Sequence, residues 1–336
     1  MELQEAIQII KQRHQTDIER INDEKNVIQK YGSLFHPNNL DNLKAEDFKS
    51  FLLIKNNKHW DGIHRQGNMI TSDMVKLKST LKLLLDESKP IKERLNKIMP
   101  KDKPSMIKGL GRAVLTPILL VVYPDKYCVY NSIAETGMKG FSIFPSFRNE
   151  SFAEKYVKIN EVINNLAKEN GLSLWQIDEV WWLATSSFSP SEEEPETEQG
   201  EEEGLPAEVE SQLEEFLISN WEKISEFGDL EILQEDGEYI GQQYDTKEVG
   251  RIDLLCKNKK TGDFVVIELK KGRESDKVVG QTLRYIGWVK KNLAIQNQEV
   301  YGLIISYEDD PRLRYSLEPI KNLIQLKFYK ISITIS

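Results

Sequence analysis

The chain has 336 residues, of which 39% are hydrophobic, so it is long enough to bury the cores of two domains. No apolar run reaches the length of a membrane span, and the first residues lack the basic start and apolar stretch of a secretory signal. The net charge of −9 argues against a histone-like, nonspecific DNA binder, although it allows DNA binding through one local basic face. We therefore expect a cytoplasmic protein without a membrane partner.

The first 185 residues read as a mainly helical domain. Isoleucines spaced between Ile7 and Ile28 predict a loosely amphipathic opening helix. Apolar residues over 74–85 predict a second helix, begun near Asp73, whose side chain can cap it. A third helix is expected over 157–166, ending near Asn170-Gly171.

Residues 91–112 form a basic segment, with seven lysines and arginines against only Glu93 and Asp102. The segment ends in a Gly-x-Gly turn before an apolar helix, where exposed backbone N–H groups can bind a phosphate. It resembles the helix-hairpin-helix element of DNA-binding and base-excision proteins. The alternative is a tight interhelical turn beside a solvated basic face. Asn131 stands where such glycosylases carry a catalytic aspartate, which argues against glycosylase chemistry. The DNA-binding candidates of this segment are Lys101, Lys103, Lys108, Gly109, Gly111 and Arg112.

A second recognition candidate lies around Trp60, where His59, His64 and Arg65 are close in sequence. Aromatic, imidazole and guanidinium groups can stack on and hydrogen-bond an unpaired base, so these four residues are further DNA-binding candidates. The stretch resembles the N-terminal region of some McrB-like restriction ATPases, which implies a recognition module for modified DNA. The alternative is that the tryptophans are core and the histidines structural. Five residues separate His59 from His64, a poor spacing for a zinc pair on a helix.

The expected domain of 1–185 is followed by residues 186–205, which are rich in Ser, Pro, Gly and Glu. Residues 191–205 alone hold eight glutamates and no basic residue, a composition that cannot support a core. We expect a disordered acidic linker. It is either a soluble spacer or a DNA-charge mimic that damps nonspecific cutting.

The third part, residues 206–336, carries the strongest chemical pattern. Asp253 lies on one apolar strand, and Glu268-x-Lys270 lies on the next, with a polar turn around Gly262 between them. Alternation along a strand places Glu268 and Lys270 on one face and the aliphatic residues Val265, Ile267 and Leu269 on the other. Carboxylate oxygens suit Mg²⁺ or Mn²⁺, and a lysine can neutralise charge that develops at a phosphate. A bare pattern of this kind also occurs by chance on exposed hairpins.

Two residue types are informative by their positions. All four histidines precede residue 65, so residues 206–336 hold no histidine for a zinc site or a Ser-His-Asp triad. The two cysteines, Cys128 and Cys256, both sit in apolar stretches. We expect two buried thiols rather than a disulfide.

Residues 207–335 resemble the PD-(D/E)xK nuclease superfamily, and most closely the C-terminal domain of the NucS/EndoMS-type endonucleases. Four blocks carry the resemblance: a helix with Glu210, Glu214 and Asn220-Trp221; Gly250-Arg251-Ile252-Asp253; Val266-Ile267-Glu268-Leu269-Lys270; and Gly280-Gln281 with Tyr285. The resemblance implies an α/β domain with a mixed central sheet flanked by helices. It also implies that Asp253, Glu268 and Lys270 are catalytic, that Glu210 or Glu214 assists the metal bound by Asp253 and Glu268, and that Gln281 supports the site.

The sequence therefore predicts a metal-dependent DNA endonuclease that cuts DNA recognised by the helical domain, with restriction of modified DNA as the expected role. A mismatch- or branch-directed repair nuclease, and a non-catalytic DNA-binding adaptor, are the alternatives. Cutting both strands needs two active sites, which a homodimer would supply. A separate NTPase partner stays open, since the chain has no Gly-x(4)-Gly-Lys-Ser/Thr.

Overall fold

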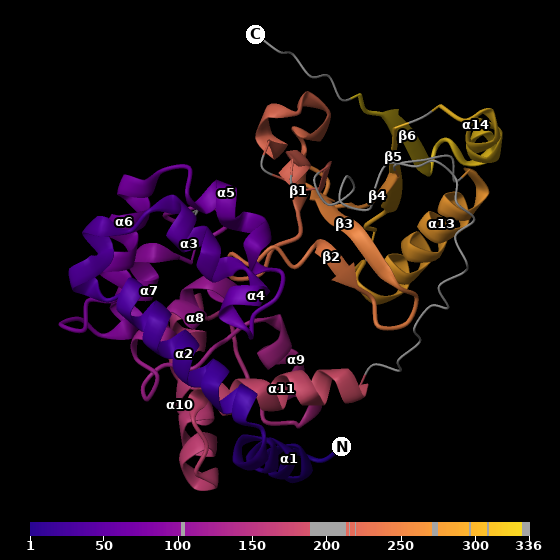
Figure 1. The fold of residues 1–336 in the computed structure, drawn as a ribbon. Helices are drawn as coiled ribbons and strands as arrows, with labels where there is room; N and C mark the ends of the chain where they lie inside the picture. The colour runs from indigo at the N-terminus through magenta and orange to yellow at the C-terminus, as the bar shows by residue number, and fades with distance from the viewer. Residues whose placement is uncertain are drawn as a thin grey trace. The chain divides into compact units, whose positions relative to one another are not determined.

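The chain folds into two compact units, which a computed structural model describes for residues 1–101, 105–188, 213–214, 216–218, 220–270, 275–295, 297–307 and 309–330 (Figure 1). Unit 1 comprises Met1–Glu192 together with Asp236–Glu238. Unit 2 comprises Glu193–Glu235 and Tyr239–Ser336. Residues 186–188 of the expected linker still belong to a helix, so the disordered linker does not begin at 186, and the rest of it lies outside the described residues. Among the helices of the described ranges, none is long and apolar enough to cross a membrane.

Unit 1 is built from helices, as expected. They are α1 Leu3–Thr16, α2 Ile18–Leu34, α3 Ala45–Leu52, α4 Ile54–Asn57, α5 Gly67–Ile70, α6 Met74–Leu84, α7 Ile91–Ile98, α8 Arg112–Val122, α9 Ser132–Gly140, α10 Phe152–Asn170 and α11 Leu174–Phe188, with short 3₁₀ turns at Pro37–Asn42 and Ile63–Gln66.

Local capping signals explain several helix ends of unit 1. Asp73 accepts a hydrogen bond from the Lys76 N–H at the start of α6, and Gly171 ends α10 with a left-handed φ of 63°. The expectation of one opening helix over 7–28 is wrong. The chain breaks at Asp17, which has extended dihedrals and caps α2 by accepting from the Arg20 N–H.

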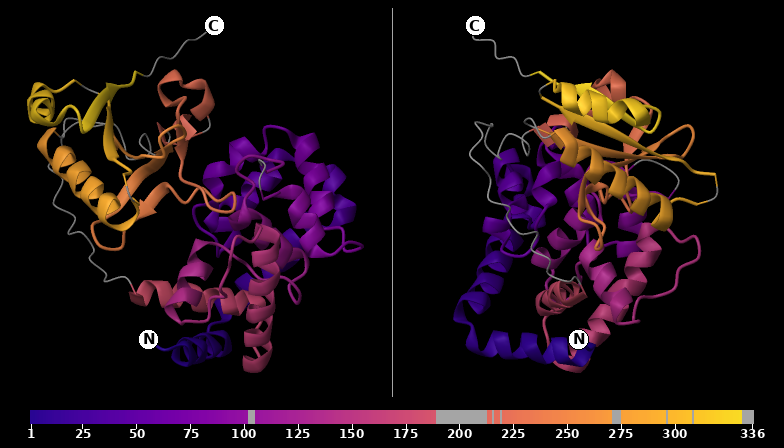
Figure 2. Two further views of the ribbon diagram at one scale, coloured as in Figure 1. Left: turned by 180° about the vertical axis from the view of Figure 1, so that it is seen from behind. Right: turned by 90° about the vertical axis from the view of Figure 1, so that its right-hand side faces the viewer.

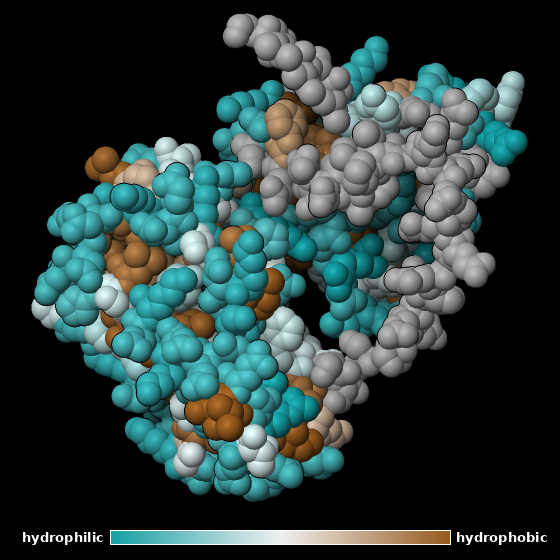
Figure 3. All heavy atoms as spheres, viewed as in Figure 1, coloured by the Kyte–Doolittle hydropathy of each residue, from teal (hydrophilic) through white to brown (hydrophobic). Residues whose placement is uncertain are grey.

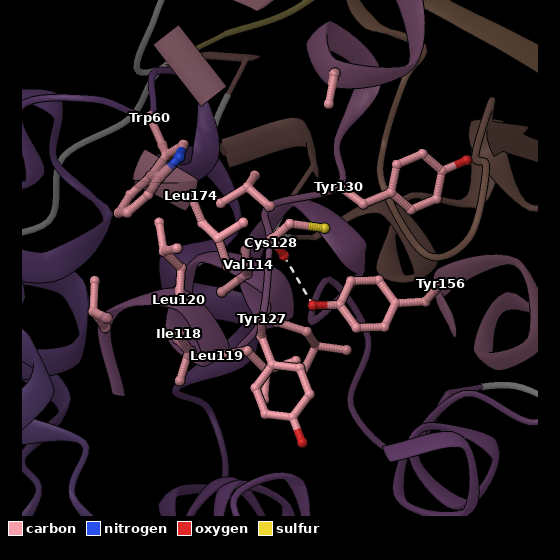
Figure 4. Close-up of a cluster of buried hydrophobic side chains, with 14 of the residues drawn as sticks. Trp60, Val114, Ile118, Leu119, Leu120, Tyr127, Cys128, Tyr130, Tyr156 and Leu174 are labelled. Atoms are coloured by element: carbon pink, nitrogen blue, oxygen red, sulfur yellow. Dashed lines mark hydrogen bonds between the residues drawn. The ribbon is translucent and has the colours of Figure 1, made fainter. Parts of the chain in front are cut away.

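The core of unit 1 gathers large apolar side chains from most of its helices. Figure 4 shows Trp60, Leu119, Cys128 and Leu174 in one buried cluster, with the Tyr156 hydroxyl donating to the Cys128 carbonyl at 2.8 Å. The face of the molecule drawn in Figure 3 is mostly hydrophilic, with apolar side chains in separate patches. Both cysteines are buried and free, which confirms that they form no disulfide.

Unit 2 is a mixed sheet with helices. Its strands are β1 Leu230–Ile232, β2 Gln242–Asp245, β3 Arg251–Asn258, β4 Phe264–Lys270, β5 Val300–Ser306 and β6 Ile324–Phe328. Its helices include α13 Ser275–Asn292 and α14 Pro311–Leu317, and 3₁₀ turns lie at Trp221–Lys223, Ser225–Phe227 and Glu318–Ile320.

The sheet runs in the order β1-β3-β4-β5-β6, and β2 pairs with the other half of β3. β1, β2 and β4 are antiparallel to β3, whereas β4, β5 and β6 are mutually parallel. Helix α13 is the crossover between β4 and β5 and packs on both, with α14 beside it (Figure 2). The expected fold class, a helical region followed by an α/β domain with a mixed sheet, is confirmed.

Candidate active site

The β3–β4 hairpin brings the two parts of the acidic motif together. Leu254 lies opposite Ile267, and the turn closes through the left-handed Gly262, whose N–H donates to the Asn258 carbonyl. One residue further along the ladder, the Leu269 N–H donates to Asp253 Oδ2 at 2.8 Å. The hairpin therefore places the Asp253 carboxylate against the Glu268-x-Lys270 strand, as the spacing predicts.

Glu268 is fully buried, with 0% of its surface exposed. Lys270 Nζ lies 3.9 Å from Glu268 Oε2, as expected for neighbours on one face of a strand. Phe264 and Val266 share the Glu268 face and belong to the core beneath α13. A buried carboxylate needs a compensating charge, which Lys270 supplies here and a bound cation would supply more strongly.

Glu214 is the member of the expected acid pair that the structure brings to this site, while Glu210 lies outside the described residues. The two oxygens of Glu214 accept from two glutamines of β2. Gln242 Nε2 donates to Oε1 at 2.7 Å, and Gln243 Nε2 donates to Oε2 at 2.5 Å. Gln243 Nε2 also donates to Asp253 Oδ1 at 3.3 Å, so one amide nitrogen joins the two carboxylates.

Gln281 contacts a tyrosine of its own helix. Its amide donates to the Tyr285 hydroxyl at 3.1 Å, one helical turn further along α13. Burial raises the pKa of the Tyr285 phenol, the Gln281 hydrogen bond lowers it in part, and the charge of Glu268 raises it again. Gly250 makes room for this phenol, because a Cβ there would lie 2.8 Å from the hydroxyl and the backbone has a φ of 105°.

The carboxyl group of Asp253 is largely shielded from water. Burial raises the pKa of its carboxyl, and the Leu269 N–H, the Lys270 charge and the Gln243 amide offset this only in part. In the absence of a cation the folded protein therefore favours the protonated form of Asp253 more than the unfolded chain does. A nearby divalent cation would reverse that preference.

The donors of this site fit a hard divalent cation. Within the described ranges, no three His, Cys, Asp or Glu side chains are already grouped as metal ligands. Two of the carboxylates meet at one amide nitrogen, since Glu214 and Asp253 both accept from Gln243. Oxygen donors of this kind suit Mg²⁺ or Mn²⁺. Asp253, Glu214 and Glu268 are the residues that would hold the cation.

Sequence reasoning missed Gln242 and Gln243. They lie on a four-residue strand without apolar alternation, so no periodicity marks the strand. Their one visible signal is a pair of adjacent amides shortly before the Gly250-to-Asp253 motif. Tyr285 belongs to the motif that carries the resemblance, and the structure adds its hydrogen bond to Gln281.

The structure separates the DNA-binding candidates of the basic segment. Lys101 and Lys108 are exposed, whereas Lys103 lies outside the described residues. Arg112 is only 1% exposed, and it donates to Glu135 at 2.7 Å and to Glu238 at 2.8 Å within unit 1. The prediction that Arg112 offers its guanidinium to DNA is therefore wrong for this structure.

The Gly-x-Gly turn is real but closely packed. Gly109 has a left-handed φ of 81°, and Gly111 caps the start of α8. A Cβ at Gly111 would meet the backbone of Gly237 at 2.2 Å, and the Arg112 N–H donates to the Asp236 carbonyl at 3.2 Å. Backbone groups of unit 1 thus fill the place in which a phosphate was expected, so the turn is structural here.

The proposed base pocket around Trp60 is also part of the core. Trp60 is 1% exposed, packs edge-on against Trp175 and donates its Nε1–H to Asp178 at 2.9 Å. His59 Nε2 meets the same carboxylate oxygen at 2.9 Å. Trp60 therefore presents no face for stacking on a base, and His59 is a structural partner of Asp178. His64 and Arg65 lie half-buried on a 3₁₀ turn, and their role in DNA binding stays a prediction.

Asn131 has a structural role as well. It accepts from the Ala134 N–H and caps α9, and its side chain is mostly buried. The asparagine is therefore accounted for by its capping role.

Comparison with known proteins finds similarity over part of the chain. Part of the chain is similar to the crystal structure of a repair endonuclease from Pyrococcus abyssi, with 20% identity over 39% of this chain and 49% of that chain, and a TM-score of 0.28. It is similar to the same extent to an EndoMS–double-stranded DNA complex, with 20% identity over 41% and 50% of the two chains, and a TM-score of 0.29. The chain thus covers about half the length of these solved proteins. The comparison with curated proteins found no match. The resemblance carried by the four sequence blocks is confirmed at the level of a family, since residues 209–315 match the Endonuclease NucS C-terminal domain.

Proposed function

We propose that the protein is a metal-dependent DNA endonuclease whose active site consists of Asp253, Glu268, Lys270 and Glu214. One observation carries the proposal: a β-hairpin sets Asp253 against the Glu268-x-Lys270 strand, and the Gln243 amide joins Asp253 to Glu214. The match of residues 209–315 to an endonuclease family supports the same chemistry.

Each side chain has a definite task in this proposal. A bound Mg²⁺ or Mn²⁺ would polarise the scissile phosphate and lower the pKa of a water molecule. Asp253, Glu214 and Glu268 supply the negative charge that holds the cation. Lys270, on the face of Glu268, neutralises charge that develops on the phosphate. Gln281 orients Tyr285, which packs against Gly250 at the start of the Asp253 strand.

Between the two roles considered for the enzyme, we favour DNA repair at mismatched or branched sites. The match of residues 209–315 to the NucS endonuclease domain favours the repair role that this resemblance implies. Restriction rested on the stretch around Trp60, and its burial removes Trp60 as a base-stacking residue. Restriction of modified DNA is the second candidate, and it requires that the helical domain bind DNA, for which Lys101 and Lys108 are exposed. A homodimer would supply the second active site needed for a double-strand break.

The test is cleavage of four duplexes that differ in one feature: plain, mismatched, branched and base-modified. We expect cleavage with Mg²⁺ or Mn²⁺, loss of cleavage on chelation, and preference for the mismatched or branched duplex. Preference for the modified duplex would support restriction instead.

The adaptor alternative is tested with a lysine pair. Lys270→Met should lower the rate on the order of 10²-fold, while Lys257→Met, on the same hairpin, should change it little. DNA binding without cleavage by the wild-type protein under any divalent metal would establish the adaptor.

A further inference from the structure

Gln243 occupies a singular position between the carboxylates of unit 2. Its amide nitrogen is 2.5 Å from Glu214 Oε2 and 3.3 Å from Asp253 Oδ1, so one nitrogen donates to both acids. Hydrogen bonds to ionised acceptors are among the stronger ones in proteins. The N–H groups of Gln243 thus lie between the two carboxylates, in a place that a small cation could also occupy.

The backbone of Gln243 is held in an uncommon conformation. Its φ is +49°, a left-handed value that side chains other than Gly, Asn and Asp rarely adopt. The neighbouring pairs are Gln242 with Leu254 and Tyr244 with Ile252, so Gln243 faces Asp253 across the ladder. A left-handed backbone is unfavourable for a non-glycine residue, and such residues gather at functional sites. The pairing of β2 with β3 therefore keeps Gln243 in an unfavourable backbone conformation, and this conformation places its amide between the two acids.

We propose that Gln243 is a positioning residue of the cation site, which bridges Glu214 and Asp253 through its N–H groups when the site holds no cation and offers its carbonyl oxygen when a cation binds. The proposal rests on the proposed endonuclease function. A half-turn of the terminal amide exchanges nitrogen for oxygen without moving the rest of the side chain. An amide oxygen is a hard, neutral donor of the kind that Mg²⁺ and Mn²⁺ accept. Gln243 thereby holds the negatively charged Glu214 and Asp253 close together before the cation binds, and it adds no charge of its own once the cation is bound.

The direct test measures Mn²⁺ binding to the full chain by calorimetry, with thermal unfolding to check that each variant folds. Gln243→Leu removes both the bridge and the oxygen, and we expect about 10- to 100-fold weaker Mn²⁺ binding. Gln243→Lys places a permanent ammonium between the two acids, and we expect no Mn²⁺ binding together with unchanged or higher thermal stability. Gln298→Leu is the matched control, because Gln298 also donates an amide hydrogen bond, to the Gly262 carbonyl, away from the acids.

A third variant separates positioning from ordinary packing. Gln243→Glu keeps the size and the oxygen but loses the N–H bridge, so three acids then face one another. We expect a lower melting temperature without metal and a larger rise on adding Mn²⁺ than in the wild type. A side chain at position 243 that lies outside the cation site would give equal rises in both proteins.

The outcomes distinguish this inference from the function on which it rests. If the wild type binds Mn²⁺ and cleaves DNA while Gln243→Leu binds Mn²⁺ equally well, the role of Gln243 is refuted and the endonuclease stands. Mn²⁺ binding by Gln243→Lys at wild-type affinity would refute it as well. If the wild type itself binds no divalent metal, the proposed function fails, and the inference fails with it.

Discussion

Replacing Asp253 by asparagine is expected to abolish cleavage and to stabilise the protein at neutral pH. Asparagine keeps the shape of the side chain and an oxygen that can accept the Leu269 N–H, which donates to Asp253 at 2.8 Å. It removes the charge that the cation needs, so we expect a loss of cleavage on the order of 10²-fold or more. It also removes a charge whose burial disfavours folding, as the raised pKa of Asp253 shows.

The raised pKa of Asp253 determines how the stability difference between the wild type and Asp253→Asn changes with pH. Because the pKa of Asp253 is raised in the folded protein, the folded state binds the proton more tightly than the unfolded chain. Ionisation of Asp253 therefore lowers the free energy of unfolding as the pH rises from the ordinary pKa of aspartate to the raised pKa of the folded state. Above the raised pKa the loss of stability is complete and constant. The asparagine variant does not titrate, so its advantage should be complete at neutral pH and should vanish in acid.

The size of the gain is that of a typical stabilising substitution, about 0.5–2 kcal/mol. The assay is thermal unfolding from pH 3 to pH 8 in a metal-free buffer, beside cleavage in Mg²⁺. Asp245→Asn is the control on the neighbouring strand. Burial raises the Asp245 pKa, but the Lys247 hydrogen bond and charge outweigh it and leave the pKa lowered. Asp245→Asn should therefore slightly destabilise the protein above the ordinary pKa of aspartate and leave cleavage unchanged.

Two results would refute this reasoning. Wild-type cleavage by Asp253→Asn would remove Asp253 from the active site. A melting temperature at pH 7 below that of the wild type, with the fold retained, would show that the carboxylate stabilises the protein in the absence of metal.

Three further predictions concern unit 1 and the two thiols. Trp60→Ala should cost about 3–5 kcal/mol of stability and weaken binding to plain and modified duplexes equally, because the indole is core; unfolding and affinity measurements check this. Joint Lys101→Gln and Lys108→Gln substitution should reduce the salt dependence of DNA binding, by roughly one unit of slope for each phosphate that a lysine no longer neutralises; an unchanged slope would place the DNA-binding face elsewhere. The thiols of Cys128 and Cys256 should resist alkylation until the protein unfolds, because burial raises the pKa of each; rapid labelling of the native protein would contradict their placement.

The sequence alone determined the features that depend on short-range patterns. Period-two alternation and the Gly262 turn fix the β3–β4 hairpin, and the hairpin alone brings Asp253 to the Glu268-x-Lys270 strand. Capping residues such as Asp73 and Gly171 predict where helices α6 and α10 begin and end. These features were predictable because each depends on neighbours within a few residues or across one tight turn.

Only the tertiary structure decided which polar residues serve the site and which serve the core. Gln243 reaches Glu214 across 29 residues of chain, and Trp60 reaches Asp178 across 118, and no local pattern records either contact. Arg112 looks like a DNA contact in a basic segment, yet Glu135 and Glu238 neutralise it in the interior of unit 1. A charged or aromatic side chain has the same sequence signature whether it faces solvent or a buried partner. Its role therefore depends on desolvation and long-range pairing, which exist only in the folded chain.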